Sequence, residues 1–188
     1  MESSAHIEPK ISQLIYIYRH EDKNVKALKK KFSKNGLFLD KIPLNLESMV
    51  TKNCVVCFDD WEDMLQKKEY LSMLIRFSSF LIHHVPCLLI VTVQSYQMFY
   101  AKSPLHPILF QCTSLVLFRS VHNFSQLRRI LNSFDIPLKS GSTLYEIFKK
   151  FVDSRYKYII VNISPCLDCP LVYSQILYND PRPFILFT

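Results

Sequence analysis

Glycine is almost absent from this chain of 188 residues, which contains only Gly36 and Gly141. A Walker A loop, which holds nucleotide phosphates in its backbone amides, needs the pattern Gly-x-x-x-x-Gly-Lys-Ser/Thr, and neither glycine is followed by lysine. The Gly-x-Ser-x-Gly turn that presents a nucleophilic serine is also missing. These 188 residues therefore contain neither a glycine-rich phosphate loop nor a glycine-flanked nucleophile turn, and a function assigned to them cannot depend on either.

A long apolar run and a secretory leader are lacking as well. The most apolar window, residues 77–93, is interrupted by His83, His84 and Pro86, so it falls short of the roughly 20 apolar residues that cross a bilayer. Residues 1–10 are polar and contain no apolar signal-peptide core. We therefore expect no membrane segment or membrane partner, an intracellular location, and reduced cysteines rather than disulfides.

The composition indicates a folded, basic protein. With 49% hydrophobic residues, the chain can bury the core of one medium-sized domain and is too apolar to be disordered. The net charge of +7 is concentrated in one segment, which contains Lys23, Lys26, Lys29, Lys30, Lys31 and Lys34. This cluster fits either a solvated helix face or a surface that meets nucleic-acid phosphates, and charge alone does not separate the two.

The most informative stretch is Cys54 to Asp60, an apolar run that ends on two adjacent carboxylates. A strand that is apolar on both faces is typical of the middle of a parallel sheet, where ligands gather at the carboxyl ends of the strands. A second such run, residues 87–93, is followed by Gln94. If a helix over residues 71–83 joins the two strands as parallel neighbours, Asp59, Asp60 and Gln94 share one rim of the sheet.

The rest of the chain alternates strands and helices, which predicts an α/β fold with a mainly parallel sheet flanked by helices. Further strands are expected at residues 13–18, 37–39, 114–118 and 157–163. Helices are expected where Val25, Leu28 and Phe32 recur, from Phe124 with Arg128 and Arg129 on its outer side, and from Thr143, whose capping box includes Glu146. Gly36 suits the left-handed position after the first helix.

This pattern predicts one α/β domain over residues 1–165. Prolines at positions 165, 170, 181 and 183 then indicate an extended tail over residues 166–188, with residues 184–187 added at a sheet edge.

The order of these parts resembles the viral genome-packaging ATPases of the FtsK–HerA superfamily, in the Polinton-like and poxvirus-type forms. Residues 55–60 resemble their Walker B strand, and His83-His84 followed by residues 88–94 resembles their paired histidines and the strand that ends in a sensor glutamine. Residues 115–119 and 156–160 resemble later strands. The resemblance covers roughly residues 13–165 and lies downstream of the place where those proteins carry the Walker A loop.

The resemblance implies a P-loop NTPase-like fold that lacks the P-loop strand. It assigns Mg²⁺ to Asp59, the orientation of the attacking water to Asp60, and a γ-phosphate sensor role to Gln94. Mg²⁺ and ATP are then expected only if a P-loop is supplied by missing or partner sequence. Because the family forms rings, a homo-oligomer or a complementing polypeptide is expected to cover the open strand edges, in the host cell of a virus and in association with virions.

Departures from the family pattern indicate lost activity. Val85 stands where those proteins tend to carry an arginine, His122 replaces a basic residue, and Asn162 replaces an acid. Each change removes charge that stabilises a transferring phosphoryl group or organises the site. We therefore expect a degenerate or partial packaging ATPase that does not hydrolyse ATP alone.

Other interpretations remain open at this stage. The chain also fits a non-enzymatic module that binds DNA or a virion component through Lys26, Lys29, Lys30, Arg128 and Arg129, while Asp59 and Asp60 belong to a solvated acidic turn. Cys54-x-x-Cys57 and Cys166-x-x-Cys169 formally provide four zinc ligands. Positions i and i+3 of a strand point to opposite faces, however, which argues against Cys54 and Cys57 holding one ion.

Overall fold

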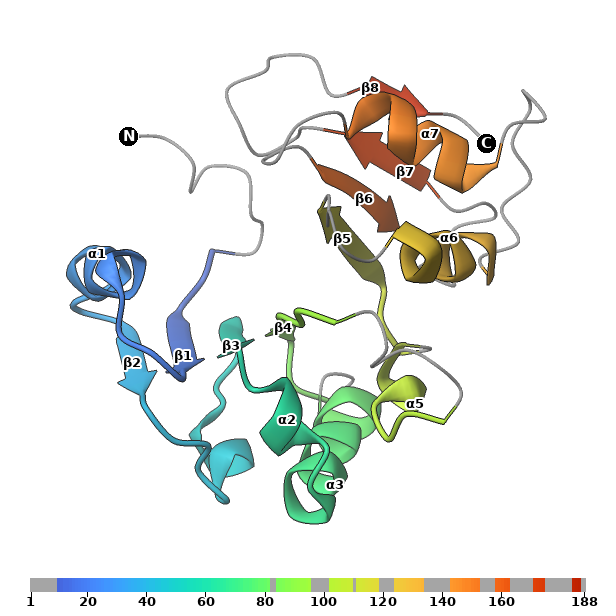
Figure 1. Ribbon diagram of the computed structural model, residues 1–188. Helices are drawn as coiled ribbons and strands as arrows, with labels where there is room; N and C mark the ends of the chain where they lie inside the picture. Colours follow the sequence, from blue (N-terminus) through green and yellow to red (C-terminus); the bar gives the residue numbers. More distant parts are fainter. Residues whose placement is uncertain are drawn as a thin grey trace. The chain divides into compact units, whose positions relative to one another are not determined.

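The computed structural model describes residues 10–81, 84–95, 102–109, 111–118, 124–133, 143–152, 158–162, 171–174 and 184–186. Residue contacts divide the chain into two compact units, Met1–Gln94 with Ala101–Ile108, and Ser95–Tyr100 with Leu109–Thr188. In the part of the chain that is described, each unit contains one four-stranded sheet (Figure 1).

The first unit contains a parallel sheet with the strand order β2-β1-β3-β4. Its strands are β1 (Gln13–Tyr18), β2 (Gly36–Leu39), β3 (Cys54–Asp59) and β4 (Cys87–Val91). The helices are α1 (Lys23–Lys31), η1 (Leu46–Met49), α2 (Glu62–Leu65), α3 (Lys68–Arg76), which continues into the π-helix η2 (Phe77–Leu81), and α5 (His106–Leu109). The predicted α/β architecture with a mainly parallel sheet flanked by helices is confirmed for this unit.

Strand β3 lies in the interior of the sheet because its sequence is apolar on both faces. Residues 54–58 are all buried, and β3 pairs in parallel with β1 on one side and β4 on the other. Helix α1 packs its apolar side inward through Val25, which is 2% exposed. The central place predicted for this strand is therefore correct, and its carboxyl end is fixed by neighbours on both sides.

Strand β4 differs from the prediction that it is apolar and covered on both faces. Its residues alternate between partly buried and exposed, with Leu88 48% and Ile90 40% exposed. Among the described residues, β4 pairs only with β3, so it is an edge strand of the sheet. An apolar run predicts the strand itself but not whether a neighbour covers it.

Gly36 is required because a side chain would not fit at this position, and not because the backbone is left-handed there. The predicted left-handed position after the first helix is therefore wrong. The residue is the first of β2, and its amide donates to the carbonyl oxygen of Phe32 at 2.7 Å. A Cβ atom at this position would lie 2.6 Å from that same carbonyl oxygen and 2.5 Å from Cε2 of Phe38. The close approach of the end of α1 to β2 therefore requires glycine.

The second unit contains an antiparallel sheet, which the sequence did not predict. It consists of β5 (Ser114–Phe118), β6 (Tyr158–Asn162), β7 (Leu171–Ser174) and β8 (Phe184–Leu186), in that order. The helices are α6 (Phe124–Ser133) and α7 (Leu144–Phe151), and the capping box of Thr143 and Glu146 is present as predicted. A core that includes Leu117, Leu127, Phe148 and Ile159 joins the helices to β5 and β6.

This division differs from the predicted domain over residues 1–165 and tail over 166–188. Strands β5 and β6 pair with each other and not within the parallel sheet, and β7 lies inside the segment predicted as a tail. Strand β5 alternates exposed and buried residues, the pattern of an antiparallel strand with one covered face. Strand β8 lies at the sheet edge, as predicted for residues 184–187.

The fold predicts that Gly36→Ala destabilises the protein by about 1–3 kcal/mol, because overpacking against the fixed Phe32 carbonyl forces the backbone to move. Urea unfolding monitored by circular dichroism measures this loss. Ser33→Ala is the matched control, since Ser33 is exposed in the same turn. Equal unfolding midpoints for the two variants would show that the close approach does not require glycine.

Candidate functional site

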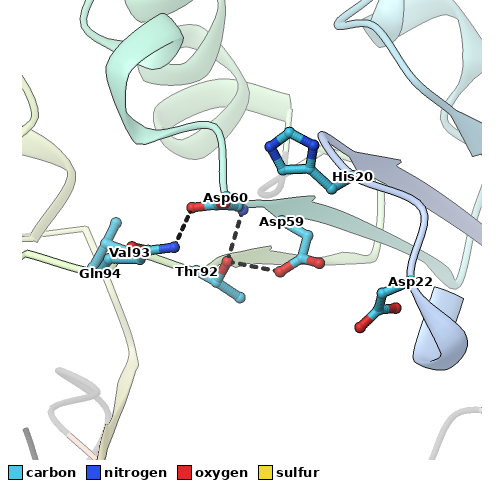
Figure 2. A pocket seen from close by; sticks show the side chains of 7 residues that line it. All are labelled: His20, Asp22, Asp59, Asp60, Thr92, Val93 and Gln94. Carbon is cyan, nitrogen blue, oxygen red and sulfur yellow. Dashed lines mark hydrogen bonds between the residues drawn. The ribbon is translucent and has the colours of Figure 1, made fainter.

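The side chains of Asp60 and Gln94 meet at the rim formed by the carboxyl ends of the parallel strands. Asp59 is the last residue of β3, Asp60 follows it, and Gln94 lies just beyond the end of β4. The side-chain amide of Gln94 donates to Oδ1 of Asp60 at 2.6 Å (Figure 2). The predicted placement of all three residues on one rim is confirmed, while their chemical roles remain predictions.

Thr92 links the two strand ends, and the sequence interpretation missed it. Its hydroxyl oxygen lies 3.0 Å from Oδ1 of Asp59 and 3.1 Å from the backbone nitrogen of Asp60 (Figure 2). Its own backbone amide donates to the carbonyl oxygen of Phe58 at 3.0 Å, which extends the β3–β4 ladder by one residue. A hydroxyl residue directly after a parallel strand was the signal that could have identified Thr92.

Tyr16 of β1 contacts Asp59 from the opposite side of β3. Its hydroxyl donates to Oδ2 of Asp59 at 2.8 Å, so both carboxylate oxygens of Asp59 accept a hydroxyl proton. Burial, and then the hydrogen bond and negative charge of Asp59, raise the pKa of Tyr16 far above its ordinary value. The phenol therefore stays protonated and remains a hydrogen-bond donor.

Asp60 adopts a left-handed backbone conformation, with φ of 63°. This conformation is uncommon outside glycine, and Asp is one of the residues that tolerate it. Here it directs the amide of Asp60 to Thr92, while the backbone amide of Gln94 donates to Oε2 of Glu62 at 2.7 Å. The turn after β3 is thus tied to the segment after β4 by backbone and side-chain bonds.

A hollow of about 340 Å³ is lined by the residues at the strand ends, Asp59, Asp60, Thr92, Val93 and Gln94, and by two residues of the loop between β1 and α1. His20 and Asp22 lie on the α1 side of the hollow, and Thr92, Val93 and Gln94 on the β4 side (Figure 2). Oδ1 of Asp22 accepts hydrogen bonds from the amides of Asn24 and Val25, both at 2.8 Å. The bond from Val25 is the main cause that lowers the pKa of Asp22, which caps α1 as a carboxylate.

The basic residues predicted to bind DNA lie in both units. Lys26 and Lys30 are exposed on α1, but Lys29 is half-buried and pairs with Glu21 at 2.6 Å, and its amine also donates to the hydroxyl of Tyr18. Arg128 and Arg129 are exposed on α6 in the second unit, with the Arg128 guanidinium 5.6 Å from the ring of Tyr145. Lys29 is therefore engaged within the protein.

Several candidate residues lie outside the described part of the chain, namely His83, His122, Cys166 and Cys169. Within the described ranges, no three His, Cys, Asp or Glu residues form a group that could hold a metal ion. Cys54 and Cys57 are buried free thiols, and burial raises the pKa of each. No helix among the described residues is long and apolar enough to cross a membrane.

Comparisons with family models, with curated proteins and with solved structures give no match. The site must therefore be interpreted from its own chemistry. Carboxylate and amide oxygens are suited to a hydrated divalent cation and to orienting water, whereas a bare anion would be repelled by the carboxylates of Asp22, Asp59 and Asp60 in the lining.

The contact between Tyr16 and Asp59 predicts how stability changes in alkaline solution. Because the pKa of Tyr16 is raised in the folded state, its contribution is fully present below the ordinary tyrosine pKa of about 10 and is lost as the pH rises above that value. The free energy of unfolding should therefore fall between about pH 10 and pH 11, and this fall should be smaller in Tyr16→Phe. Parallel slopes in urea unfolding of the two proteins would contradict the prediction.

Proposed function

We propose that the first unit provides the carboxylate half of a nucleoside-triphosphate site, in a viral DNA-packaging ATPase-like protein that does not hydrolyse ATP alone. The observation that carries this proposal is the rim on which Asp59, Asp60 and Gln94 are tied together at the ends of neighbouring parallel strands. The resemblance of residues 55–60 and 88–94 to the Walker B and sensor segments of the FtsK–HerA ATPases supports it.

The phosphate-binding half is not provided by the loop after β1. In parallel sheets, the amino end of the helix that follows the first strand commonly binds phosphate through free backbone amides. Here the carboxylate of Asp22 accepts the amides of Asn24 and Val25, so the protein's own anion occupies that position. The loop also contains no glycine that would allow the backbone to wrap around a phosphate.

The missing half is expected from a complementing polypeptide or from another copy in an oligomer. The described sheet has two edge strands, β2 and β4, and the free side of β4 is the edge next to Asp59 and Asp60 where an added strand finds unpaired backbone groups. The exposed side chains of Leu88 and Ile90 on the same strand would gain burial from such an addition. A strand paired there would end on the same rim as Asp59 and Gln94 if it ran parallel to β4.

Mg²⁺ fits this site only as an ion that keeps water or phosphate ligands. The described residues hold no group of three ligands for an ion, but Asp59 and Asp60 supply the oxygen donors that Mg²⁺ takes in nucleotide sites. When bound, the ion would neutralise phosphate charge. Asp59 would hold the ion, and Asp60 and Gln94 would orient water beside it.

We predict that the purified chain, which lacks the phosphate-binding half, binds ATP weakly and mainly through Mg²⁺, and that it shows no turnover above background. Removing Mg²⁺ with a chelator, or introducing Asp59→Asn, should weaken binding at least about tenfold, which corresponds to losing one interaction with a charged group. A fluorescent ATP analogue measures binding, and phosphate release measures turnover. Asp40→Asn is the control because Asp40 is exposed after β2, outside the hollow.

Two results would overturn the proposal. Robust hydrolysis by the chain alone that Asp59→Asn abolishes would show a complete active site. Binding that is equally strong without Mg²⁺ would show that the carboxylates do not face the phosphates.

A second candidate function, binding of DNA phosphates, is favoured by a stripe of lysines on α1. Lys23, Lys26 and Lys30 are separated by three and four residues, so they share one face of the helix, and all three are exposed. Val25 and Leu28 lie on the opposite, inward side. The stripe, which we call the α1 lysine stripe, extends about 10 Å along the helix axis.

The α1 lysine stripe predicts salt-sensitive binding to double-stranded DNA. Changing Lys23, Lys26 and Lys30 together to glutamate should weaken binding and reduce the salt dependence by about 0.9 logarithmic units per lost phosphate contact. The matched control changes Lys52, Lys67 and Lys68, which are exposed elsewhere in the first unit, to glutamate. Equal losses in both triple variants would indicate a general charge effect and count against a specific surface.

A further inference from the structure

Thr92 contacts both Asp59 and Asp60 through one side chain. Its hydroxyl lies 3.0 Å from the Asp59 carboxylate, 3.1 Å from the Asp60 amide and 3.4 Å from the Phe58 carbonyl oxygen. We infer that Thr92 is a positioning residue that holds the two carboxylates as one unit. The functional part of this inference rests on the proposed nucleotide site.

The direction of each hydrogen bond follows from the chemistry of a hydroxyl, which has one proton and two lone pairs. The Asp60 amide can only donate, so Thr92 accepts from it. The hydroxyl proton then goes to the Asp59 carboxylate, because a bond to a charged acceptor is stronger and this distance is shorter than that to Phe58. The result is a relay from the Asp60 amide through Thr92 to Asp59, in which each bond polarises the next.

The position of Thr92 is itself fixed by the backbone. Its amide donates to the Phe58 carbonyl oxygen at 3.0 Å, in continuation of the parallel ladder in which Phe58 pairs with Val91. The hydroxyl therefore has little freedom to move away from the end of β3. Strand β4 thus controls the geometry of two residues that belong to the turn after β3.

Asp59 is held from both neighbouring strands. Thr92 binds Oδ1 and Tyr16 binds Oδ2, so rotation of the carboxylate breaks a hydrogen bond on one side or the other. A carboxylate has about four lone-pair positions, so oxygens that accept these hydroxyls can still contact a cation or water. Fixing the carboxylate plane sets the direction in which those remaining lone pairs point.

Asp60 depends on the same hydroxyl through its backbone. Its left-handed conformation presents the amide to Thr92, and from this position its carboxylate accepts the Gln94 amide at 2.6 Å. Loss of the Thr92 hydroxyl removes the acceptor for this amide and the donor for Asp59 in one step. Both carboxylates should then lose their fixed relation to each other.

The test compares Thr92→Val, which keeps the shape and removes the hydroxyl, with Thr92→Ser, which retains the hydroxyl. In the full chain, solvent exchange of the Asp60 amide measured by NMR should be about tenfold faster in Thr92→Val, the equivalent of one lost hydrogen bond. Thr92→Ser should restore the original exchange rate. Thr51→Val is the matched control, because its hydroxyl bonds to Gln13 at 2.9 Å, away from the rim.

The same variants test the link to the nucleotide site. Affinity for Mg-ATP should fall in Thr92→Val and return in Thr92→Ser, with Thr51→Val unchanged. If the Asp60 exchange follows the expected pattern but the original chain binds no Mg-ATP, the proposed function fails while the positioning role stands.

Three outcomes overturn the inference itself. Unchanged Asp60 exchange in Thr92→Val shows that the hydroxyl does not hold this turn, and faster exchange that Thr92→Ser does not restore shows that another feature of the side chain does. Unchanged Mg-ATP affinity in a Thr92→Val protein with faster exchange removes the functional part. If Thr92→Val does not fold, Thr92→Ala is measured against Thr92→Ser by the same criteria.

Discussion

The parallel pairing of β3 with β1 and β4 is the constraint on which the site depends. Phe58 pairs with Val91 on one side, and Tyr16 pairs with Cys57 on the other, so the carboxyl ends of all three strands reach the same rim. A shift of one residue in either pairing would turn Tyr16 or Thr92 to the wrong face or the wrong height. The hydroxyl contacts of Asp59 therefore follow from the register of the sheet, in which the buried apolar run of β3 is the shared central strand.

The electrostatics of the rim explain why only half of a phosphate site can be proposed. Asp59 and Asp60 are stabilised by hydroxyl and amide donors, and the hollow has no lysine or arginine in its described lining. Such a surface favours a cation and disfavours an isolated phosphate. The amino end of α1, which would favour an anion, is already satisfied by Asp22. The scarcity of glycine and the capping role of Asp22 thus have the same consequence, because both leave phosphates without a backbone cradle.

Features that follow from the hydrophobicity of a single strand were predicted from the sequence. Features that depend on side-chain contacts between strands were missed. The unbroken apolar run of β3 identified a central strand, and the parallel-sheet rule brought Asp60 and Gln94 together. Tyr16 and Thr92 were missed because their roles require the register and the reach of each side chain. The exposed face of β4 and the antiparallel sheet could not be predicted either, since apolar runs specify neither an uncovered neighbour nor the direction of pairing.

The two proposed functions use surfaces of opposite charge, which lie at different parts of α1. The helix is capped by Asp22, which lines the acidic hollow, and is anchored by Val25, which is 2% exposed. The α1 lysine stripe lies on the face away from that anchor, while Lys29 is drawn toward Glu21 and Tyr18. A cation at the rim and a polyanion on the stripe would therefore contact different residues. Because neither surface requires the other to be empty, the two proposed functions, binding of DNA phosphates and participation in a nucleotide site, do not exclude each other.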